Sequence, residues 1–341
     1  MKTGIVWDEI FTKHDPGPGH PESPARLLSI ERRLRADGLW DRLVMVPARE
    51  ATEEEICAIH QPEYLRKVAA TEGRYVSLDP DTSTSPESYR AALKAAGGLC
   101  QLIEEVVTGK LNNGYALVRP PGHHAERDRA MGFCLFNNVA IGAAFARRKL
   151  ALERVAIIDW DLHHGNGTMH SFWEDPSVLY FSTHQYPYYP GTGAFEDVGA
   201  GAGKYYTVSV PLTGGMGDNE FRAIFRRILL PVLEQFSPQL ILVSTGYDIY
   251  QGDPLGAMEV SETGFGDLMW ELLQAAAKSC SGRLVAVLEG GYNLQGLAGG
   301  VACAVRALLG EHRPAEFSGD GGRARPVIEM VMKLQKNHWK F

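Results

Sequence analysis

Residues able to bind a metal and to move protons occur in four short clusters of this 341-residue chain. Asp161 and His163 stand two positions apart in one cluster, and Asp248 stands in another. In extended backbone, residues i and i+2 point to the same side, so a carboxylate oxygen and an imidazole nitrogen can face one ion. With Asp248 as a third ligand, this donor set suits Zn²⁺ with an open position for water. Fe²⁺ or Co²⁺ would also fit, because nitrogen and oxygen ligands discriminate poorly among these metals.

The other two clusters carry acid–base groups. His123 and His124 form an adjacent pair behind a Pro-Pro-Gly segment, and a histidine near a metal-activated water is a natural general base or acid. Asp159 and Asn166 are available as partners that would tune the pKa of the two rings. Tyr292 follows two glycines, whose backbone freedom can aim its phenol at a developing oxyanion. The alternatives are a core role for one of the two histidines and a surface turn for Tyr292.

Apolar strands must position these clusters. Five segments have the pattern of buried parallel strands, at residues 115–118, 155–158, 178–182, 240–244 and 284–288. Four of them run directly into one of the clusters, all except 178–182. In an open parallel sheet the ligands bind at the carboxyl ends of the strands, so the clusters are expected to converge. Asp248 alone could equally cap a helix, but four coincident clusters favour a site.

Segments with helical periodicity alternate with these strands, as in βαβ architecture. Thr52 and Glu55 form a capping box that opens one helix. Further helices are expected over 138 to about 150, 219 to about 236, and 265 to about 279, with a kink or break at Pro231. Segments 10–26 and 72–88 are rich in Pro, Gly, Ser, Thr and Asp and are expected to be loops. We expect one α/β/α sandwich, formed by a single domain over residues 1–341.

The composition is that of an ordinary globular protein, with 45% hydrophobic residues, 22% charged residues and a net charge of −7. Because the sequence has no basic stripe, a nucleic-acid partner is not expected. No apolar run approaches the ~18 residues of a membrane span, and the N-terminus becomes acidic too early for a signal peptide, so a cytoplasmic protein is expected. The cysteines lack CxxC spacing, which predicts reduced, buried thiols at Cys57, Cys100, Cys134, Cys280 and Cys303.

The motifs that contain these residues resemble those of the histone deacetylase superfamily, and most closely the class IIb deacetylase domains. This superfamily includes bacterial acetylpolyamine amidohydrolases and histone-deacetylase-like amidohydrolases. The resemblance covers nearly the whole chain through segments 19–22, 119–125, 131–138, 159–168, 175–180, 252–256 and 288–293. It implies the three-layer α/β/α arginase-like fold with a mainly parallel eight-stranded sheet.

The resemblance implies the same three metal ligands and assigns roles to their neighbours. His124 would be the general base and then the general acid, and His123 would be an electrostatic partner bonded to Asp159. Tyr292 would polarise the scissile carbonyl. Asn166 stands where class I members have Asp and class II members have Asn. His124 then has no charged partner, which should leave its pKa lower than an aspartate would.

The resemblance also implies two structural K⁺ ions, the first of them beside the divalent metal. One K⁺ would be held by Asp159, the backbone of Asp161 and His163, Ser182 and Thr183. A second K⁺ would be held by Phe172, Asp175 and Val178.

Five residues are expected to shape the substrate site. Phe133, with Gly132 beside it, would line one wall of the family's acyl-lysine tunnel. Tyr189 falls where most members place the facing Phe, which adds a hydroxyl to the wall. Asp81 lies near the loop position that grips the substrate backbone or amine in relatives. Leu255 stands where the polyamine-specific class IIb enzyme has an acidic gatekeeper, so an acetyl-lysine-type substrate is favoured over an acetylpolyamine.

Two other functions are considered. An arginase-type binuclear manganese hydrolase needs bridging carboxylates where this chain has Gly165 and Tyr250, so one catalytic metal is favoured. A non-catalytic binder of acylated ligands is disfavoured because the full set of ligands, histidines and tyrosine is present. The sequence therefore predicts a metal-dependent amide hydrolase that removes acetyl or other short acyl groups from small-molecule or peptide N-acyl amines. A homo-oligomer is left open.

Overall fold

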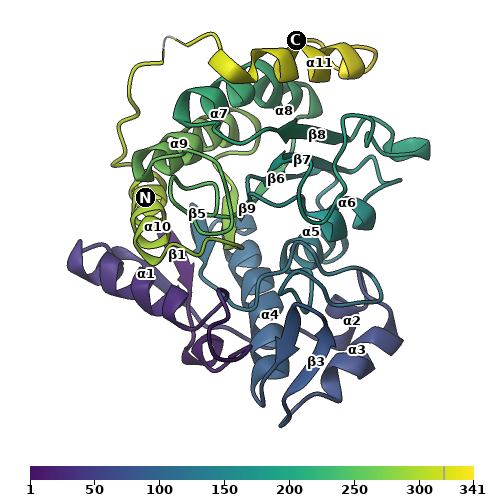
Figure 1. Ribbon diagram of the computed structural model, residues 1–341, viewed down its shortest axis with the longest axis vertical. Helices are drawn as coiled ribbons and strands as arrows, with labels where there is room; N and C mark the ends of the chain where they lie inside the picture. Colours follow the sequence, from purple (N-terminus) through teal and green to yellow (C-terminus); the bar gives the residue numbers. More distant parts are fainter. Residues whose placement is uncertain (318) are drawn as a thin grey trace.

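The protein, seen here as a computed structural model, is described over residues 1–317 and 319–341 (Figure 1). Within these residues one sheet has eight strands in the order β2-β1-β5-β10-β9-β6-β7-β8. All of its neighbouring strands are parallel. The strands are β1 (Thr3–Val6), β2 (Val44–Val46), β5 (Asn113–Ala116), β6 (Val155–Asp159), β7 (Val178–Gln185), β8 (Thr207–Leu212), β9 (Leu240–Thr245) and β10 (Leu284–Leu288). The predicted parallel eight-stranded sheet is confirmed.

All five predicted strands occur, with shifts at their ends. The first begins two residues earlier than predicted, as β5, and β7 continues three residues further. The three strands without a prediction lie toward the two edges of the sheet, where the apolar pattern is weak. In β2 the side chains of Val44 and Met45 are exposed. The edge strand β8 contains Pro211, which a central strand would not tolerate.

Helices cover both faces of the sheet. They are α1 (Ala25–Ala36), α2 (Glu53–Ile56), α3 (Pro62–Ala69), α4 (Ser88–Val107), α5 (Asn138–Arg148), α6 (Asn166–Ser171), α7 (Asp218–Ile224), α8 (Leu230–Phe236), α9 (Glu262–Ser279), α10 (Leu294–Leu308) and α11 (Arg325–Gln335). Helices α4 and α5 pack on one face, whereas α9 and α10 cover the other, with α1 against α10 (Figure 1). The capping box is present, since Thr52 and Glu55 exchange hydrogen bonds of 2.8 and 3.2 Å at the start of α2. These layers form the three-layer α/β/α fold that was predicted.

The helix predicted over 219–236 is continuous but not regular. It consists of α7, a π-helical segment (Phe225–Leu229) and α8. The Leu230 N–H donates to the carbonyl of Phe225, five residues back, and Pro231 follows at the start of α8. A wider turn accommodates the proline ring, which would clash with the carbonyl four residues before it. The predicted irregularity therefore occurs in the turn before Pro231.

The prediction that segment 72–88 is only a loop is wrong. Strands β3 (Val76–Asp79) and β4 (Thr82–Thr84) pair there as an antiparallel hairpin. Most of its side chains are short and polar, so they leave little hydrophobic alternation to detect. The other predicted loop, 10–26, is entered by a short 3₁₀ turn (Glu9–Thr12) and leads into α1.

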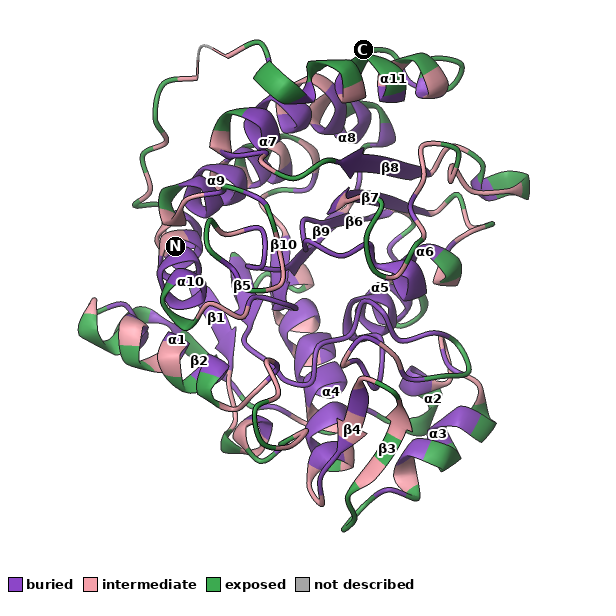
Figure 2. Ribbon diagram, viewed as in Figure 1, coloured by how far each residue is buried: buried purple, intermediate pink, exposed green. Residues whose placement is uncertain are grey.

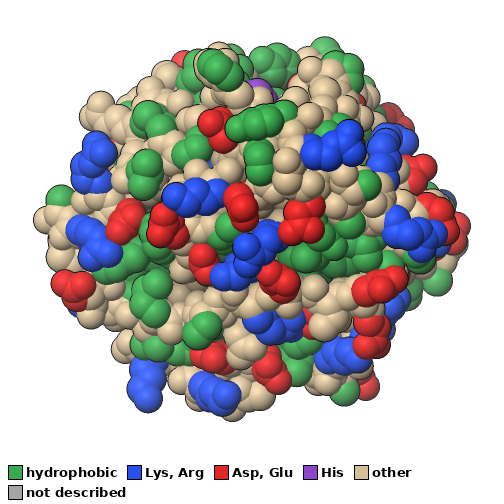
Figure 3. Space-filling model, turned by 90° about the horizontal axis from the view of Figure 1, so that it is seen from below, with side chains coloured by type: hydrophobic (Ala, Val, Ile, Leu, Met, Phe, Trp, Pro, Cys, Tyr) green, Lys and Arg blue, Asp and Glu red, His purple; other side chains and the backbone are tan. Residues whose placement is uncertain are grey.

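Buried residues concentrate in the sheet and on the inner faces of its helices (Figure 2). All five cysteines are free thiols, but Cys57 and Cys303 are only half-buried, so the prediction of burial is wrong for these two. None of the described helices is both long and apolar enough to cross a membrane. On the face seen in Figure 3, basic and acidic side chains are interspersed rather than gathered by sign.

Candidate functional site

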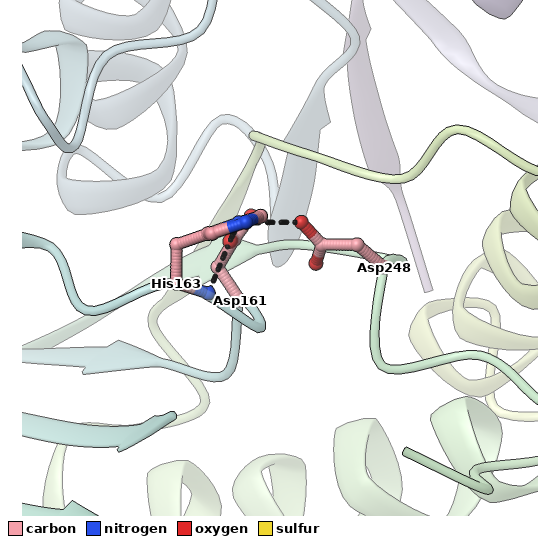
Figure 4. A group of neighbouring side chains, drawn as sticks. All are labelled: Asp161, His163 and Asp248. Atoms are coloured by element: carbon pink, nitrogen blue, oxygen red, sulfur yellow. Dashed lines mark hydrogen bonds and ion pairs between the residues drawn. The ribbon is translucent and has the colours of Figure 1, made fainter. Parts of the chain in front are cut away.

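The four predicted clusters follow four strands that lie next to one another, β5, β10, β9 and β6. Asp161 and His163 come after β6, and Asp248 comes after β9. The Nδ1 atom of His163 lies 3.2 Å from Asp161 Oδ1 and 3.1 Å from Asp248 Oδ2 (Figure 4). All three side chains are buried, and their potential ligand atoms lie within 4.8 Å of one another. The tertiary structure thus brings together the three residues predicted as metal ligands.

Backbone groups orient the two carboxylates. The Leu162 N–H donates to Asp248 Oδ1 at 2.9 Å, and the Gly290 N–H donates to Asp161 Oδ2 at 2.8 Å. Glycine is needed beside them, because a Cβ at Gly246 would lie 2.1 Å from Asp161 Oδ2. A Cβ at Gly290 would lie 2.4 Å from Asp248 Oδ2. The two glycines therefore leave the space in which the carboxylates face His163.

The electrostatics of this cluster favour a cation. Burial and the nearby Asp161 carboxylate raise the pKa of Asp248 to about 7. Although burial opposes the charged form of His163, hydrogen bonds to both carboxylates raise its pKa to about 9. Two buried carboxylates repel each other unless positive charge lies between them. Two oxygen donors and one imidazole nitrogen fit a divalent metal of the zinc type.

The histidine pair lies in the segment after β5, with ring centroids 4.0 Å apart. His123 Nδ1 lies 3.1 Å from Asp159 Oδ2, and His124 Nδ1 lies 2.7 Å from Asn166 Oδ1, so each ring meets its expected partner. Although burial opposes it, the charges of Asp161 and Asp159 raise the pKa of His123 to about 10.

Burial, followed by the charges of His123 and His163, holds the pKa of His124 well below its usual value. The hydrogen bond to Asn166 acts in the opposite direction and raises that pKa. Burial is thus the largest cause of the low pKa of His124, and the further lowering expected from Asn166 in place of an aspartate stays a prediction. The surroundings of the pair thus shift the two pKa values in opposite directions, upward for His123 and downward for His124.

A cavity of about 190 Å³ opens onto these residues. Its lining includes all five residues predicted to shape the substrate site, together with both histidines and Tyr292. The lining residues are Asp81, Pro121, His123, His124, Gly132, Phe133, His163, Tyr189, Leu255, Gly290 and Tyr292. The ring of Tyr189 meets the ring of His124 edge-on at 5.2 Å. The structure thus joins the metal-ligand cluster, the histidine pair and the expected tunnel residues in one site.

The β3–β4 hairpin holds one wall of this cavity. Gly132 and Phe133 have φ values of 57° and 68°, in the left-handed region. A Cβ at Gly132 would lie 2.3 Å from the ring of His124, and the left-handed backbone of Phe133 costs roughly 1–2 kcal/mol. Asp81 and Thr82 support this turn by accepting hydrogen bonds of 3.1 and 3.0 Å from the two backbone N–H groups. Asp81, predicted to grip substrate, therefore holds this wall of the cavity.

A buried network of charges without a predicted role supports the loop that carries Tyr292. Arg119 and Arg26 both pair with Glu22, and all three side chains are 0% exposed. Arg26 donates from Nε to the carbonyl of Gly291 at 2.7 Å and stacks 5.2 Å from the centre of the Tyr292 ring. The only sequence signal is that Glu22 and Arg119 both stand in the segments that resemble the superfamily.

Glu289, at the end of β10, also lacked a predicted role. Its Oε2 accepts hydrogen bonds from the backbone N–H of Gly122 at 2.7 Å and of His123 at 3.2 Å. Its Oε1 accepts one from Ser244 Oγ at 2.9 Å. Burial raises the pKa of Glu289 to about 7. This side chain ties three neighbouring strand ends together and places the histidine pair.

The residues expected to hold K⁺ lie in two groups. Asp159 of β6 pairs in register with Ser182 of β7, and Thr183 is the next residue of β7. The other group lies in the turn between α6 and β7, where the Asp175 N–H donates to the carbonyl of Phe172 at 3.0 Å. Val178 is the first residue of β7.

A metal-ligand cluster, a histidine pair and a tyrosine at the carboxyl edge of a parallel sheet are the groups that a metal-dependent hydrolase needs. Comparison with known proteins also indicates a hydrolase. The family model described as the histone deacetylase domain matches residues 20–308. The chain therefore belongs to the histone deacetylase family, and it is a deacetylase with the fold of that family.

Individual relatives support this assignment. A probable deacetylase of Archaeoglobus fulgidus is 40% identical over 298 residues, covering 87% of this chain and 83% of the relative. Polyamine deacetylase HDAC10 of Homo sapiens is 42% identical over 365 residues, which cover 100% of this chain but 53% of the relative. This chain thus spans about half the length of the human protein. The crystal structure of the HDA15 HD domain matches with a TM-score of 0.93 and 37% identity, covering 99% of this chain and 95% of that one.

Proposed function

We propose that this deacetylase uses one Zn²⁺ ion, held by Asp161, His163 and Asp248, to remove acetyl or other short acyl groups from acetyl-lysine-type substrates. One observation carries the proposal: these three buried side chains lie together, and one of them, His163, lines the cavity that His124 and Tyr292 also line. Fe²⁺ or Co²⁺ would satisfy the same donors. Structural K⁺ at the two groups of residues named above is part of the proposal.

The proposed mechanism assigns one task to each side chain. A bound divalent ion polarises an amide carbonyl and makes water more acidic. His124 is hydrogen-bonded through Nδ1 to Asn166, so its Nε2 accepts the proton of the attacking water and then delivers a proton to the leaving amine. Tyr292 donates its hydroxyl to the developing oxyanion. His123, held by Asp159, adds positive charge beside the reacting atoms. The products are a carboxylate and a free amine.

The metal content tests the first part of this proposal. Metal analysis is expected to find one divalent ion per catalytic site, and a chelator should abolish turnover until Zn²⁺ is restored. An arginase-type second ion is disfavoured by the space around Gly165, where a Cβ would lie 2.4 Å from Asp159 Oδ2. A bridging carboxylate has no room there. Two ions per site, or turnover that survives complete chelation, would contradict the proposal.

The tunnel lining supports the choice of substrate. Leu255 offers an apolar surface to the cavity, where an acidic side chain would attract a second cationic amine. We expect kcat/KM for an acetyl-lysine peptide to exceed that for N-acetylputrescine by roughly two- to fivefold, about the contribution of one partly exposed ion pair. The similarity to the human polyamine deacetylase favours the alternative, an acetylpolyamine substrate.

Two variants separate these alternatives. Leu255→Glu should raise kcat/KM on N-acetylputrescine, whereas the neutral Leu255→Gln serves as the matched control for size and polarity. A large preference of the unmodified protein for N-acetylputrescine, with no response to Leu255→Glu, would assign the protein to the acetylpolyamine alternative.

A further inference from the structure

A chain of hydrogen bonds runs from His124 through Asn166 to the protein surface, and the residues beyond Asn166 have no part in the proposed mechanism. Asn166 Oδ1 lies 2.7 Å from His124 Nδ1, and Asn166 Nδ2 donates to Glu126 Oε1 at 2.6 Å. The same Glu126 oxygen lies 2.8 Å from His170 Nδ1. Glu126 is buried, whereas His170 is exposed and lines a surface pocket of about 360 Å³.

The orientation of the Asn166 amide decides what His124 can do. An amide can present either its oxygen or its NH₂ group to a neighbour, and the two orientations have nearly the same shape. If Asn166 presents its oxygen, His124 must donate from Nδ1, which leaves the lone pair on Nε2. If Asn166 presents its NH₂ group, the proton moves to Nε2 and His124 can no longer act there as a base.

Glu126 selects between these orientations. An ionised carboxylate can only accept hydrogen bonds, so it holds the NH₂ group of Asn166 and repels its oxygen. Although burial opposes ionisation, hydrogen bonds from His170 and Asn166 lower the pKa of Glu126 below its usual value. The amide nitrogen also lies 3.3 Å from the carbonyl of His124 and 3.4 Å from the sulfur of Met131, contacts that an amide oxygen would not replace.

We propose that Glu126 is a positioning residue that acts through Asn166 to keep His124 in the tautomer with a free Nε2. The proposal rests on the proposed function, because it assumes that His124 Nε2 is the proton acceptor. It has a consequence for position 166. An aspartate there would place two buried carboxylates about as close as the 2.6 Å contact now made by Asn166 and Glu126. Residue 166 should therefore tolerate a negative charge only when the charge of residue 126 is removed at the same time.

A double-mutant cycle tests this coupling on the Zn²⁺-loaded protein. The variants are Glu126→Gln, Asn166→Asp and the two combined, each assayed for kcat and KM on an acetyl-lysine peptide. Asn166→Asp should lower kcat about 100-fold, within the range for impaired acid–base catalysis, with KM nearly unchanged. Glu126→Gln should stay within about threefold, because its amide oxygen still accepts from Asn166. The combined variant should recover about tenfold over Asn166→Asp, since the amide introduced at position 126 can then donate to the new carboxylate.

Two further variants separate positioning from general structure. Glu126→Leu removes the acceptor and should lower kcat about tenfold, whereas His170→Ala removes only the exposed partner and should leave kcat within about twofold of the parent. Additive effects in the cycle, or parental kcat in Glu126→Leu, would overturn the proposal.

The tautomer itself can be observed without turnover. In protein labelled with ¹⁵N-histidine, His124 should carry its proton on Nδ1 in the parent and lose this preference in Glu126→Leu, with His124→Ala providing the assignment. An unchanged tautomer in a folded Glu126→Leu variant rejects the positioning role. If instead the parent is inert on every acyl amine, the proposed function fails, while the tautomer experiment still decides the role of Glu126.

Discussion

Tyr292→Phe is expected to lower kcat by about 10²–10³-fold, the usual cost of removing one oxyanion donor. The ring should keep its place, because it packs edge-on against Phe133 at 5.9 Å and beneath the guanidinium of Arg26 at 5.2 Å. Only the hydroxyl is lost, and the three metal ligands are not touched. The measurement is kcat on an acetyl-lysine peptide, together with the metal content and the melting temperature of the variant.

Tyr188 provides a matched control for this substitution. It is exposed, and its hydroxyl donates to the carbonyl of Leu255 at 3.1 Å rather than lining the cavity. Tyr188→Phe should therefore change kcat by less than about threefold, the effect of one exposed neutral hydrogen bond. Unchanged turnover in Tyr292→Phe would remove Tyr292 from the mechanism, whatever the control shows.

Arg119→Met is expected to destabilise the fold by about 3–5 kcal/mol, because it leaves the buried Glu22 carboxylate without its main partner. Arg119 and Glu22 are both 0% exposed. The guanidinium also donates to the backbone carbonyls of Phe11 at 2.7 Å and His14 at 3.0 Å, which tie the N-terminal segment to the core. Urea denaturation of the parent and the variant gives the difference in unfolding free energy.

An exposed ion pair supplies the control. Arg66 and Glu63 lie 2.7 Å apart with side chains 65% and 72% exposed. Arg66→Met should cost less than about 0.5 kcal/mol, since solvent screens such a pair. If the two variants lose similar amounts of unfolding free energy, burial of the Arg119 network does not contribute to stability as proposed. Arg119→Met should also weaken activity, because Glu22 would hold Arg26 less firmly over the ring of Tyr292.

Much of the fold could be predicted because its signals are local. The strands are short apolar runs, and the capping box at Thr52 joins residues three apart. The hairpin over 76–84 was not predicted, because most of its side chains are polar and show little alternation of hydrophobic and polar residues. The π-helical turn before Pro231 depends on how the chain relieves one steric clash, which the sequence pattern does not encode.

The candidate site likewise contains some residues that the sequence could connect and others that it could not. Asp161 and His163 could be paired from their spacing, and Asp248 from its place after a strand. Glu289 could not be connected with Gly122, 167 positions away, nor Glu22 with Arg119, 97 positions away, because only packing creates such contacts. The adjacency of the four strands that carry the clusters is likewise a property of the assembled sheet.

The sequence by itself determined which chemical groups are available and that they stand at strand ends, because residue identity and local periodicity are properties of the chain. Only the tertiary structure decided their chemical state. Burial holds the pKa of His124 low, and neighbouring carboxylates raise that of His123. Glu126 reaches Asn166 only in the folded protein, and there it orients the Asn166 amide that lies between His124 and the surface. Desolvation and charge act through space, so these states depend on the three-dimensional neighbours of each group and not on its neighbours in the chain.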